Sequence, residues 1–193
     1  MNFIHRQIEE SLKIKQLILN DEYFQSLIEK ASSICCEALK TNNKIFFAGN
    51  GGSAADAQHL AGELVNRFGF ERPGLAAIAL TTDTSIITSI SNDYGFDMLF
   101  SRQIQALGKK GDILIALSTS GNSSNIINGL NESKKNGIKT IGLTGSTTGK
   151  MDAICDICLK VPSDETPRIQ EAHILIGHII CSIIENNLFG KQH

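Results

Sequence analysis

The sequence predicts one α/β domain: a three-layer α/β/α sandwich with a five-stranded parallel sheet, preceded by N-terminal helices. Three observations predict it. A length of 193 residues suits a single domain. Short continuous apolar runs, typical of strands buried on both faces, alternate with helix-like segments. With only three prolines and no low-complexity tract, nothing marks a linker, so we treat residues 1–193 as one domain.

Two amphipathic helices are predicted before the alternating part of the chain. Apolar residues recur at three- and four-residue spacing over residues 22–40, and a shorter stripe is formed by Ile4, Ile8 and Leu12. A leading helix of this kind packs either on a partner subunit or on its own core. We expect residues 1–41 to form part of an oligomer interface.

The alternating part begins at residue 44. The predicted strands are residues 45–48, 75–80, 113–117, 138–143 and 154–161. The predicted helices are residues 54–67, a short one at 85–90, then 98–107, 124–135 and 167–186. In such open sheets ligands bind beyond the carboxyl ends of the strands, where the strand order reverses, so a binding site is expected in the loops at those ends.

Charge and hydropathy exclude several classes of protein. Lys plus Arg is 18 and Asp plus Glu is 20, a balance that rules out a general electrostatic nucleic-acid binder. The first 16 residues mix charges with apolar residues and lack a signal-peptide core. The longest apolar stretch, residues 174–184, contains His178 and is too short to span a bilayer. We expect a soluble cytoplasmic protein without nucleic-acid or membrane partners.

Five cysteines, an odd number without an export signal, argue against a disulfide framework. Cys155 and Cys158 form a CxxC motif within the predicted last strand. Side chains three apart on a strand point to opposite faces, so the two sulfurs are not expected to converge. Buried small apolar residues are therefore favoured over a metal or redox site.

The strand at residues 113–117 runs into a loop rich in hydroxyls, STSGNSSN (118–125), and a helix follows. Hydroxyls, a glycine and free amides at a helix N-terminus can bind an anion. The loop contains no lysine, so it differs from a nucleotide P-loop and suits a monophosphate ester. The alternative is a polar turn with an N-cap serine.

The first strand also ends in an unusual loop, GNGGS (49–53), again ahead of a helix. Glycines permit positive φ and close backbone approach to a ligand. The alternative is a tight strand-to-helix turn with Ser53 as N-cap. The pairing of this loop with the hydroxyl loop strengthens the ligand interpretation.

Candidate proton-transfer or metal-binding groups lie on two helices. His59 and Glu63 are four apart and share one helix face, which suits metal binding or proton transfer but also an ordinary helix-face hydrogen bond. On the last helix His178 interrupts an apolar surface, as many hydrogen-bonded core histidines do. A catalytic role requires His178 to face Glu63. Gln170, eight residues earlier, could flank the same groove.

A third polar cluster, SNDYG (91–95), follows the short helix at residues 85–90. Asn92 and Asp93 could bind sugar hydroxyls, or they could only form a turn.

Taken in order, these motifs resemble those of sugar isomerase (SIS) domains of the phosphoheptose isomerase type. The resembling segments are residues 50–59 with Glu63, residues 118–123, and residues 168–171 with His178. The resemblance extends from about residue 31 to residue 188 and implies the flavodoxin-like SIS fold.

The resemblance implies isomerisation of D-sedoheptulose 7-phosphate to D-glycero-D-manno-heptose 7-phosphate through an enediol, a step toward the heptoses of bacterial surface polysaccharide such as lipopolysaccharide or capsule. It also implies a homotetramer whose active sites lie between subunits, and zinc, one ion per subunit.

The family pattern assigns roles residue by residue. The implied phosphate contacts are Ser118, Thr119, Ser120 and Ser123. The implied sugar contacts are Asn50, Gly51, Gly52, Ser53, Glu63, Asn92, Asp93 and Gln170. The implied zinc ligands are His59, Glu63, Gln170 and His178. Glu63 and His178 match the acid–base pair, and glutamine is an uncommon zinc ligand.

Two other classes of protein share these motifs. Some SIS proteins similar to this family are scaffolds that bind the bacterial replication initiator, and by resemblance they lack the acid–base carboxylate and the closing-helix histidine. This chain has both Glu63 and His178, which favours the enzyme. Sugar-phosphate-sensing SIS modules accompany a DNA-binding domain, for which this chain leaves no length.

Overall fold

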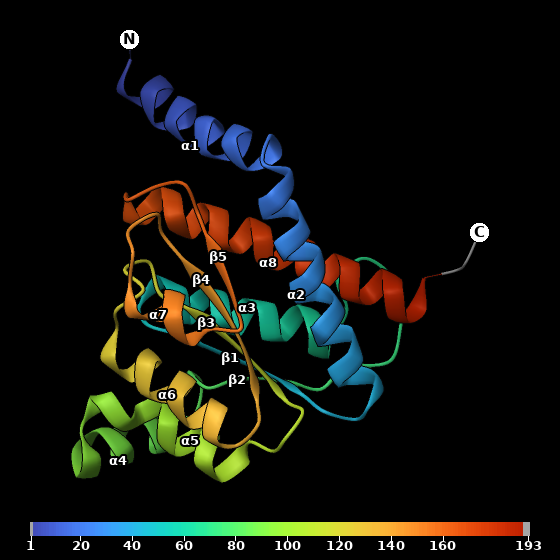
Figure 1. Ribbon diagram of the computed structural model, residues 1–193, viewed down its shortest axis with the longest axis vertical. Coiled ribbons are helices and arrows are strands. Elements are labelled where there is room, and N and C mark those ends of the chain that lie inside the picture. Colours follow the sequence, from blue (N-terminus) through green and yellow to red (C-terminus); the bar gives the residue numbers. More distant parts are fainter. Residues whose placement is uncertain (1, 191–193) are drawn as a thin grey trace.

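The computed structural model describes residues 2–190 and contains the predicted α/β/α sandwich (Figure 1). All strand pairs are parallel, and the strand order is β2-β1-β3-β4-β5. The strands are β1 (Ile45–Gly49), β2 (Ala77–Ala79), β3 (Ile113–Leu117), β4 (Lys139–Thr144) and β5 (Ile157–Lys160). The chain moves from β1 to one side and then returns to the other, so the order reverses between β1 and β3. The carboxyl ends of these two strands are therefore where a ligand is expected.

Helices cover both faces of the sheet, which explains why β1 and β3 are buried along their whole length. Phe47 and Ile115 point into a core with α2, α3 and α8, whereas Phe46 and Leu114 point into a second core with α5 and α6. The helices are α1 (Phe3–Leu19), α2 (Glu22–Lys40), α3 (Gly52–Val65), α4 (Thr84–Tyr94), α5 (Leu99–Leu107), α6 (Ser124–Lys135), α7 (Lys150–Ile154) and α8 (Thr166–Phe189), with a 3₁₀ turn, η1 (Phe96–Met98).

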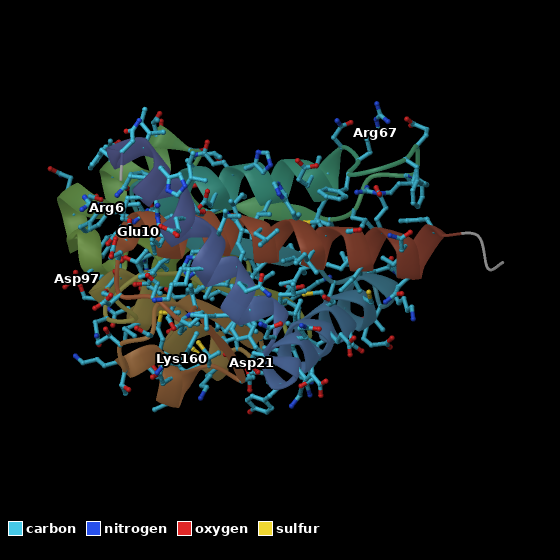
Figure 2. The ribbon with its side chains drawn as sticks, turned by 90° about the horizontal axis from the view of Figure 1, so that it is seen from above. Arg6, Glu10, Asp21, Arg67, Asp97 and Lys160 are labelled. Atoms are coloured by element: carbon cyan, nitrogen blue, oxygen red, sulfur yellow. The ribbon has the colours of Figure 1, made fainter. Side chains whose placement is uncertain are left out.

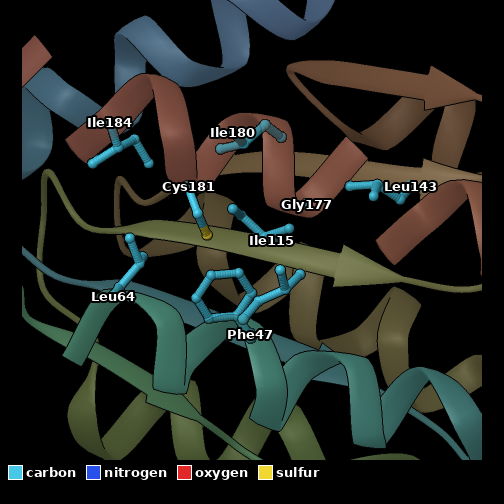
Figure 3. Close-up of a pocket in the computed structure, with 9 residues that line it drawn as sticks. Phe47, Leu64, Ile115, Leu143, Gly177, Ile180, Cys181 and Ile184 are labelled. Carbon is cyan, nitrogen blue, oxygen red and sulfur yellow. The ribbon is translucent and has the colours of Figure 1, made fainter. Parts of the chain in front are cut away.

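Helices α3 and α8 approach each other closely over β1 and β3. A Cβ added to Gly177 on α8 would lie 2.6 Å from a methyl carbon of Leu60 on α3, so only glycine permits this contact. Beside it remains an apolar gap of about 10 Å³, bordered by Phe47 and Ile115 among others (Figure 3). A gap of that size and lining stays dry. The packing of α3 on α8 is therefore tight.

The N-terminal helix leaves its apolar stripe uncovered within one chain. Ile4, Ile8 and Leu12 on α1 are 64%, 56% and 60% exposed. Figure 1 shows α1 angled away from the sheet. Arg6 and Glu10 pair on the same helix (3.6 Å) and are labelled in Figure 2, which views the molecule from above. This stripe therefore does not cover the core of its own chain, and the expected oligomer interface stays a prediction.

Helix α8 is longer than predicted and, by length and composition alone, could cross a membrane. In this structure it is a core helix that packs against α2 and α3. Ile176, Ile180 and Ile184 on it are buried against the sheet.

The predicted strand at residues 154–161 is wrong at its start. Residues Lys150–Ile154 form the short helix α7, and the strand begins only at Ile157. Asp152 explains the helix, because its carboxylate accepts the backbone N–H of Gly149 at the N-terminus. Ile154, the first residue of the predicted strand, is therefore the last residue of α7. Its apolar side chain, followed by other apolar residues, had suggested an earlier start of the strand.

This correction also changes the geometry of the CxxC motif. Cys155 ends α7 while Cys158 lies on β5, so their sulfurs converge, contrary to the prediction. A Cβ on Gly142 would lie 2.7 Å from the Cys155 sulfur and 3.5 Å from that of Cys158. The hydrogen bond between the thiols raises the pKa of Cys155 and lowers the pKa of Cys158. Both are free thiols.

Helix α4 is also longer than the predicted segment at residues 85–90. Asp83 caps its start by accepting the backbone N–H of Ile86 (3.0 Å), and Gly95, with φ of 86°, ends it. Asn92 and Asp93 therefore lie in the last helical turn and not in a loop.

A buried histidine gives the fold a specific pH dependence. His173 on α8 is fully buried, and its Nε2 donates to the Thr144 carbonyl (3.2 Å), while its Nδ1 has no partner among residues 2–190. Burial lowers the pKa of His173 to about 4. Below about pH 6.5 the imidazole of His173 is protonated in the unfolded chain but stays neutral in the folded one. The free energy of unfolding is therefore unaffected by His173 above that pH and decreases as the pH falls toward 4.

We expect acidification from pH 7 to pH 5 to lower the free energy of unfolding by about 2 kcal/mol through His173 alone. Urea titrations at both pH values, at one protein concentration, measure this loss. His173→Gln keeps an N–H donor toward Thr144 but does not titrate, so its loss should be smaller by that amount. An equal loss in both proteins would contradict the prediction.

Candidate active site

The glycine loop after β1 turns directly into α3. A Cβ on Gly49 would lie 2.3 Å from the Ser53 carbonyl oxygen, so the turn requires glycine there. Gly51 has φ of 58° and is the N-cap of α3, which begins at Gly52. Ser53 is buried inside the first turn, so the alternative in which it is the N-cap is wrong. The loop presents backbone, with few side chains, at the carboxyl end of β1.

The hydroxyl loop after β3 gathers its serines at the N-terminus of α6. The Ser118 hydroxyl lies 3.1 Å from that of Ser123 and 3.5 Å from that of Ser120. Ser123 immediately precedes α6 and makes no side-chain cap to it. The Thr119 carbonyl accepts the Gly145 N–H (3.1 Å), which fixes the loop to the end of β4. The serine hydroxyls and the N-terminus of α6 thus lie together, and such an arrangement can bind an anion.

A pair of side-chain amides joins the two loops. Asn50 and Asn125 each donate to the other's amide oxygen at 2.9 Å. Asn125 is buried in the first turn of α6. Sequence reasoning missed Asn125, although it directly follows the serines of the hydroxyl loop. The Asn50 amide therefore uses part of its hydrogen-bonding capacity to fix the glycine loop to the hydroxyl loop.

Three ionisable side chains meet between α3 and α8. His59 Nε2 lies 3.0 Å from Glu63 Oε1 and 2.8 Å from His178 Nε2. His178 directly follows Gly177, so the close approach of α8 to Leu60 brings it against α3. We call His59, Glu63 and His178 the triad. The structure thus brings Glu63 and His178 together from segments over 100 residues apart, as a catalytic role requires.

Asp56 is a neighbour of the triad that sequence reasoning missed. Its Oδ2 is buried and has no hydrogen-bond partner among the described residues. Burial raises its pKa, and the nearby His59 and His178 partly offset that rise. The available signal was its position three residues before His59, on the same side of α3.

Of the other predicted site residues, Gln170 lies at the glycine loop, whereas Asn92 and Asp93 lie at a separate surface groove. The Gln170 amide lies over the glycine loop, where a Cβ on Gly52 would meet its Nε2 at 2.7 Å. Eight helical residues, or about 12 Å of helix axis, separate it from His178. Asn92 donates to Asp93 (2.8 Å), and Asp93 borders a surface groove with Arg102 and not with the triad.

The triad has the donor set of an open zinc site. Its two imidazole nitrogens and one carboxylate oxygen lie within 4.8 Å of one another. Two histidines and a glutamate are a known catalytic zinc set that leaves further positions for water or substrate. The three residues therefore fit a divalent metal of the zinc type, and they equally form a hydrogen-bonded proton path.

Comparison with known proteins places this arrangement in a family. Residues 13–145 match the family model described as the SIS domain. A phosphoheptose isomerase of Aneurinibacillus thermoaerophilus is 58% identical over 191 residues, covering 99% of this chain and 96% of that protein.

Two solved structures carry the same fold over nearly the whole chain. A phosphoheptose isomerase from Francisella tularensis is 39% identical with a TM-score of 0.91, covering 95% of this chain and 96% of that one. A phosphoheptose isomerase from Neisseria gonorrhoeae is 42% identical with a TM-score of 0.88, covering 95% and 97%.

We expect Asn125→Ala to weaken binding of inorganic phosphate about tenfold, because the hydroxyl loop loses its tie to Asn50, which is left without its partner. Calorimetric titration with phosphate measures the affinity. Asn131→Ala is the matched control, since Asn131 is an exposed asparagine on the same helix. Equal affinity in both variants would contradict a role for the amide pair.

Proposed function

The chain belongs to the phosphoheptose isomerases of the SIS domain family, and from this membership and the geometry of its site we propose that it converts D-sedoheptulose 7-phosphate to D-glycero-D-manno-heptose 7-phosphate. It is a sugar-phosphate isomerase. The meeting of Glu63 and His178 through His59, next to the helix that begins at the glycine loop, is the observation that carries this proposal. Relatives named as isomerases favour the enzyme over the replication-initiator scaffold.

Glu63 is the proposed base. Ketose–aldose exchange moves a proton from C1 to C2 of the sugar through an enediol, and this requires one base beside both carbons. Glu63 Oε1 is engaged by His59 at 3.0 Å, which orients the carboxylate and leaves Oε2 to take the proton from C1 and return it to C2. The side chain is 22% exposed, so substrate can reach it.

His178 is the proposed acid. While the proton moves between carbons, another must move between the oxygens on C1 and C2, and an imidazole suits both donation and acceptance near neutral pH. Assistance in opening the sugar ring is a second proposed role of His178. The Phe68 ring, 5.7 Å from the imidazole, restricts its orientation.

The hydroxyl loop is proposed to hold the phosphate through Ser118, Thr119, Ser120 and Ser123, away from the reacting carbons. A phosphate bound there supplies binding energy and fixes the register of the sugar on the triad. Asn50, Gly51, Gly52, Ser53 and Gln170 are proposed to contact the sugar between the two ends. Gln170 fits this role because its amide lies on the glycine loop. Asn92 and Asp93 stay proposed substrate contacts.

Zinc is proposed as the metal of the triad, held by His59, Glu63 and His178. Gln170, the further ligand that the family implies, lies on the glycine loop about 12 Å along α8 from His178 and does not reach the same ion within one chain. When bound, zinc polarises a carbonyl and stabilises a negatively charged oxygen. The proton transfers described above belong to Glu63 and His178 themselves.

A homotetramer in the cytoplasm is the proposed state of the protein. The exposed stripe of α1 supports assembly, as does an apolar groove of about 440 Å³ between α1, α2 and α8. Ile18, Ile28 and Ile179 are among the residues that border the groove. Apolar surface of this extent marks an interaction site.

We expect the purified protein to form aldose from sedoheptulose 7-phosphate, and Glu63→Gln to lower kcat by about 10²- to 10⁴-fold, the usual contribution of a positioned base. The isosteric change removes the base and preserves shape. Coupled detection of the aldose measures turnover. Glu37→Gln, an exposed glutamate on α2, is the control that should keep wild-type activity. An inert wild type that binds the replication initiator would support the scaffold instead.

We expect metal analysis of the purified protein to find zinc, and His59→Ala to lose it because one of three ligands is gone. His5→Ala serves as control, since His5 is an exposed histidine on α1. Zinc content unchanged in His59→Ala would remove His59 from the metal site.

A further inference from the structure

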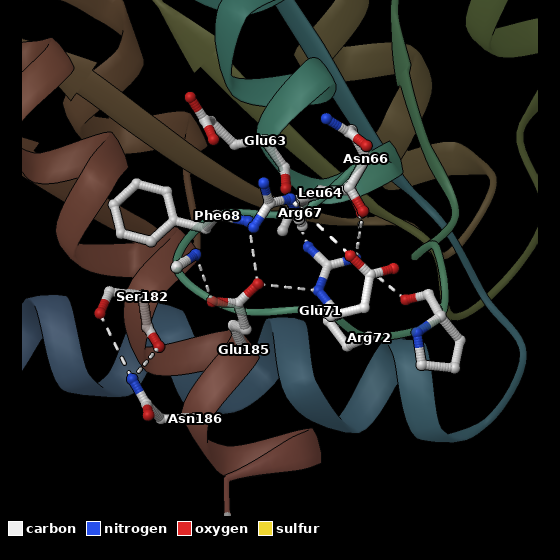
Figure 4. A network of polar contacts seen from close by, with 12 residues as sticks. Glu63, Leu64, Asn66, Arg67, Phe68, Glu71, Arg72, Ser182, Glu185 and Asn186 are labelled. Atoms are coloured by element: carbon white, nitrogen blue, oxygen red, sulfur yellow. Dashed lines mark hydrogen bonds and ion pairs between the residues drawn. The ribbon is translucent and has the colours of Figure 1, made fainter.

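A buried ion pair joins the two helices that carry the triad. Arg72, in the segment after α3, lies with its Nε 3.0 Å from Oε1 of Glu185 on α8, and both side chains are 1% exposed. Figure 4 shows the pair at the centre of a network that includes Glu63 and Phe68. Neither Arg72 nor Glu185 was singled out in the sequence.

Arg72 closes the C-terminus of α3. Its guanidinium donates to the carbonyl oxygens of Glu63 (2.8 Å), Leu64 (2.7 Å), Asn66 (3.3 Å) and Pro73 (3.0 Å). The last carbonyls of a helix have no partner within the helix, and a cation there is favourable. The backbone of Glu63 itself is therefore held by this side chain.

Glu185 holds the segment between α3 and Arg72. Its two carboxylate oxygens accept the backbone N–H groups of Phe68 (2.8 Å) and Gly69 (2.6 Å). The Phe68 ring packs on His178 at 5.7 Å between ring centroids. Glu185 lies seven residues, two turns, after His178 on the same side of α8. The backbone and Arg72 hydrogen bonds outweigh desolvation and lower the pKa of Glu185, so it stays ionised.

Stability alone does not account for such a pair. A buried ion pair costs desolvation, and well-packed apolar residues of similar size are often as stable. Apolar residues cannot donate or accept the hydrogen bonds that Arg72 and Glu185 make with the backbone at the end of α3 and in the segment after it.

We infer that Arg72 and Glu185 are positioning residues, which set the distance and orientation of Glu63 relative to His178 by fixing the end of α3, Phe68 and α8 to one another. The catalytic part of this inference rests on the proposed isomerase function. Displacement of the triad affects proton transfer and leaves the phosphate contacts in place, so kcat is the parameter that changes.

A second buried ion pair in the chain offers a matched control. Asp112, just before β3, is fully buried, pairs with Lys44 Nζ (2.7 Å) and accepts the backbone N–H groups of Lys44 and Lys109 (both 3.0 Å). It therefore makes the same kinds of bonds as Glu185, but its partners lie in the segments that precede β1 and β3, and none of them is on α3, on α8 or in the triad.

The experiment compares Glu185→Gln with Asp112→Asn. We expect both to lower the urea midpoint, but only Glu185→Gln to lower kcat, by about 10- to 100-fold, with KM for sedoheptulose 7-phosphate within about twofold of wild type. Only Glu185→Gln should shift the imidazole NMR signals of His178, assigned with His178→Gln. Equal kcat loss in both variants, or an unchanged kcat and His178 signal in folded Glu185→Gln, overturns the inference.

Arg72→Lys keeps the positive charge but not the planar fork of donors. This variant tests the positioning role if Glu185→Gln does not fold. A folded Arg72→Lys with lowered kcat and a shifted His178 signal supports the inference; one with wild-type values overturns it. An inert wild type would refute the proposed function, and the His178 signal would still test the positioning separately.

Discussion

The contact between Leu60 and Gly177 is the constraint on which the site depends. His59 precedes Leu60 and His178 follows Gly177, so the closest approach of α3 to α8 also defines where the two imidazoles meet, with 2.8 Å between their nitrogens. A Cβ at position 177 would lie 2.6 Å from the methyl carbons of Leu60, so either the Leu60 side chain or the helix would have to move. The packing of α3 on α8 in the core therefore also brings the residues of the triad together.

In the proposed function, phosphate binding and proton transfer take place at different positions in the fold. The hydroxyl loop follows β3 and the glycine loop follows β1, so both lie at the reversal of strand order, where a charged ligand finds helix N-termini. The triad lies further along α3 and α8. The proposed function requires a phosphosugar bound at the hydroxyl loop to extend from there to Glu63 and His178.

Much of this could be predicted from the sequence because local patterns were strong. Continuous apolar runs identified β1 and β3, and the glycines and serines after them identified the loops. His59 and Glu63 follow from helical spacing. The start of β5 was wrong because a capping carboxylate, Asp152, turned a strand-like run into α7. Asp56, Asn125, Arg72 and Glu185 were missed because their roles come from contacts across the fold, which no local spacing encodes.

The triad combines residues from α3 with a residue from the last helix of the chain. During synthesis the nascent chain emerges from its N-terminus and folds in that order. While α8 is still inside the ribosome, β1 and β3 can pair, but the core that Ile176, Ile180 and Ile184 fill stays open. A partly translated chain therefore holds His59 and Glu63 without His178, and the triad is complete only after α8 has emerged and packed on α3.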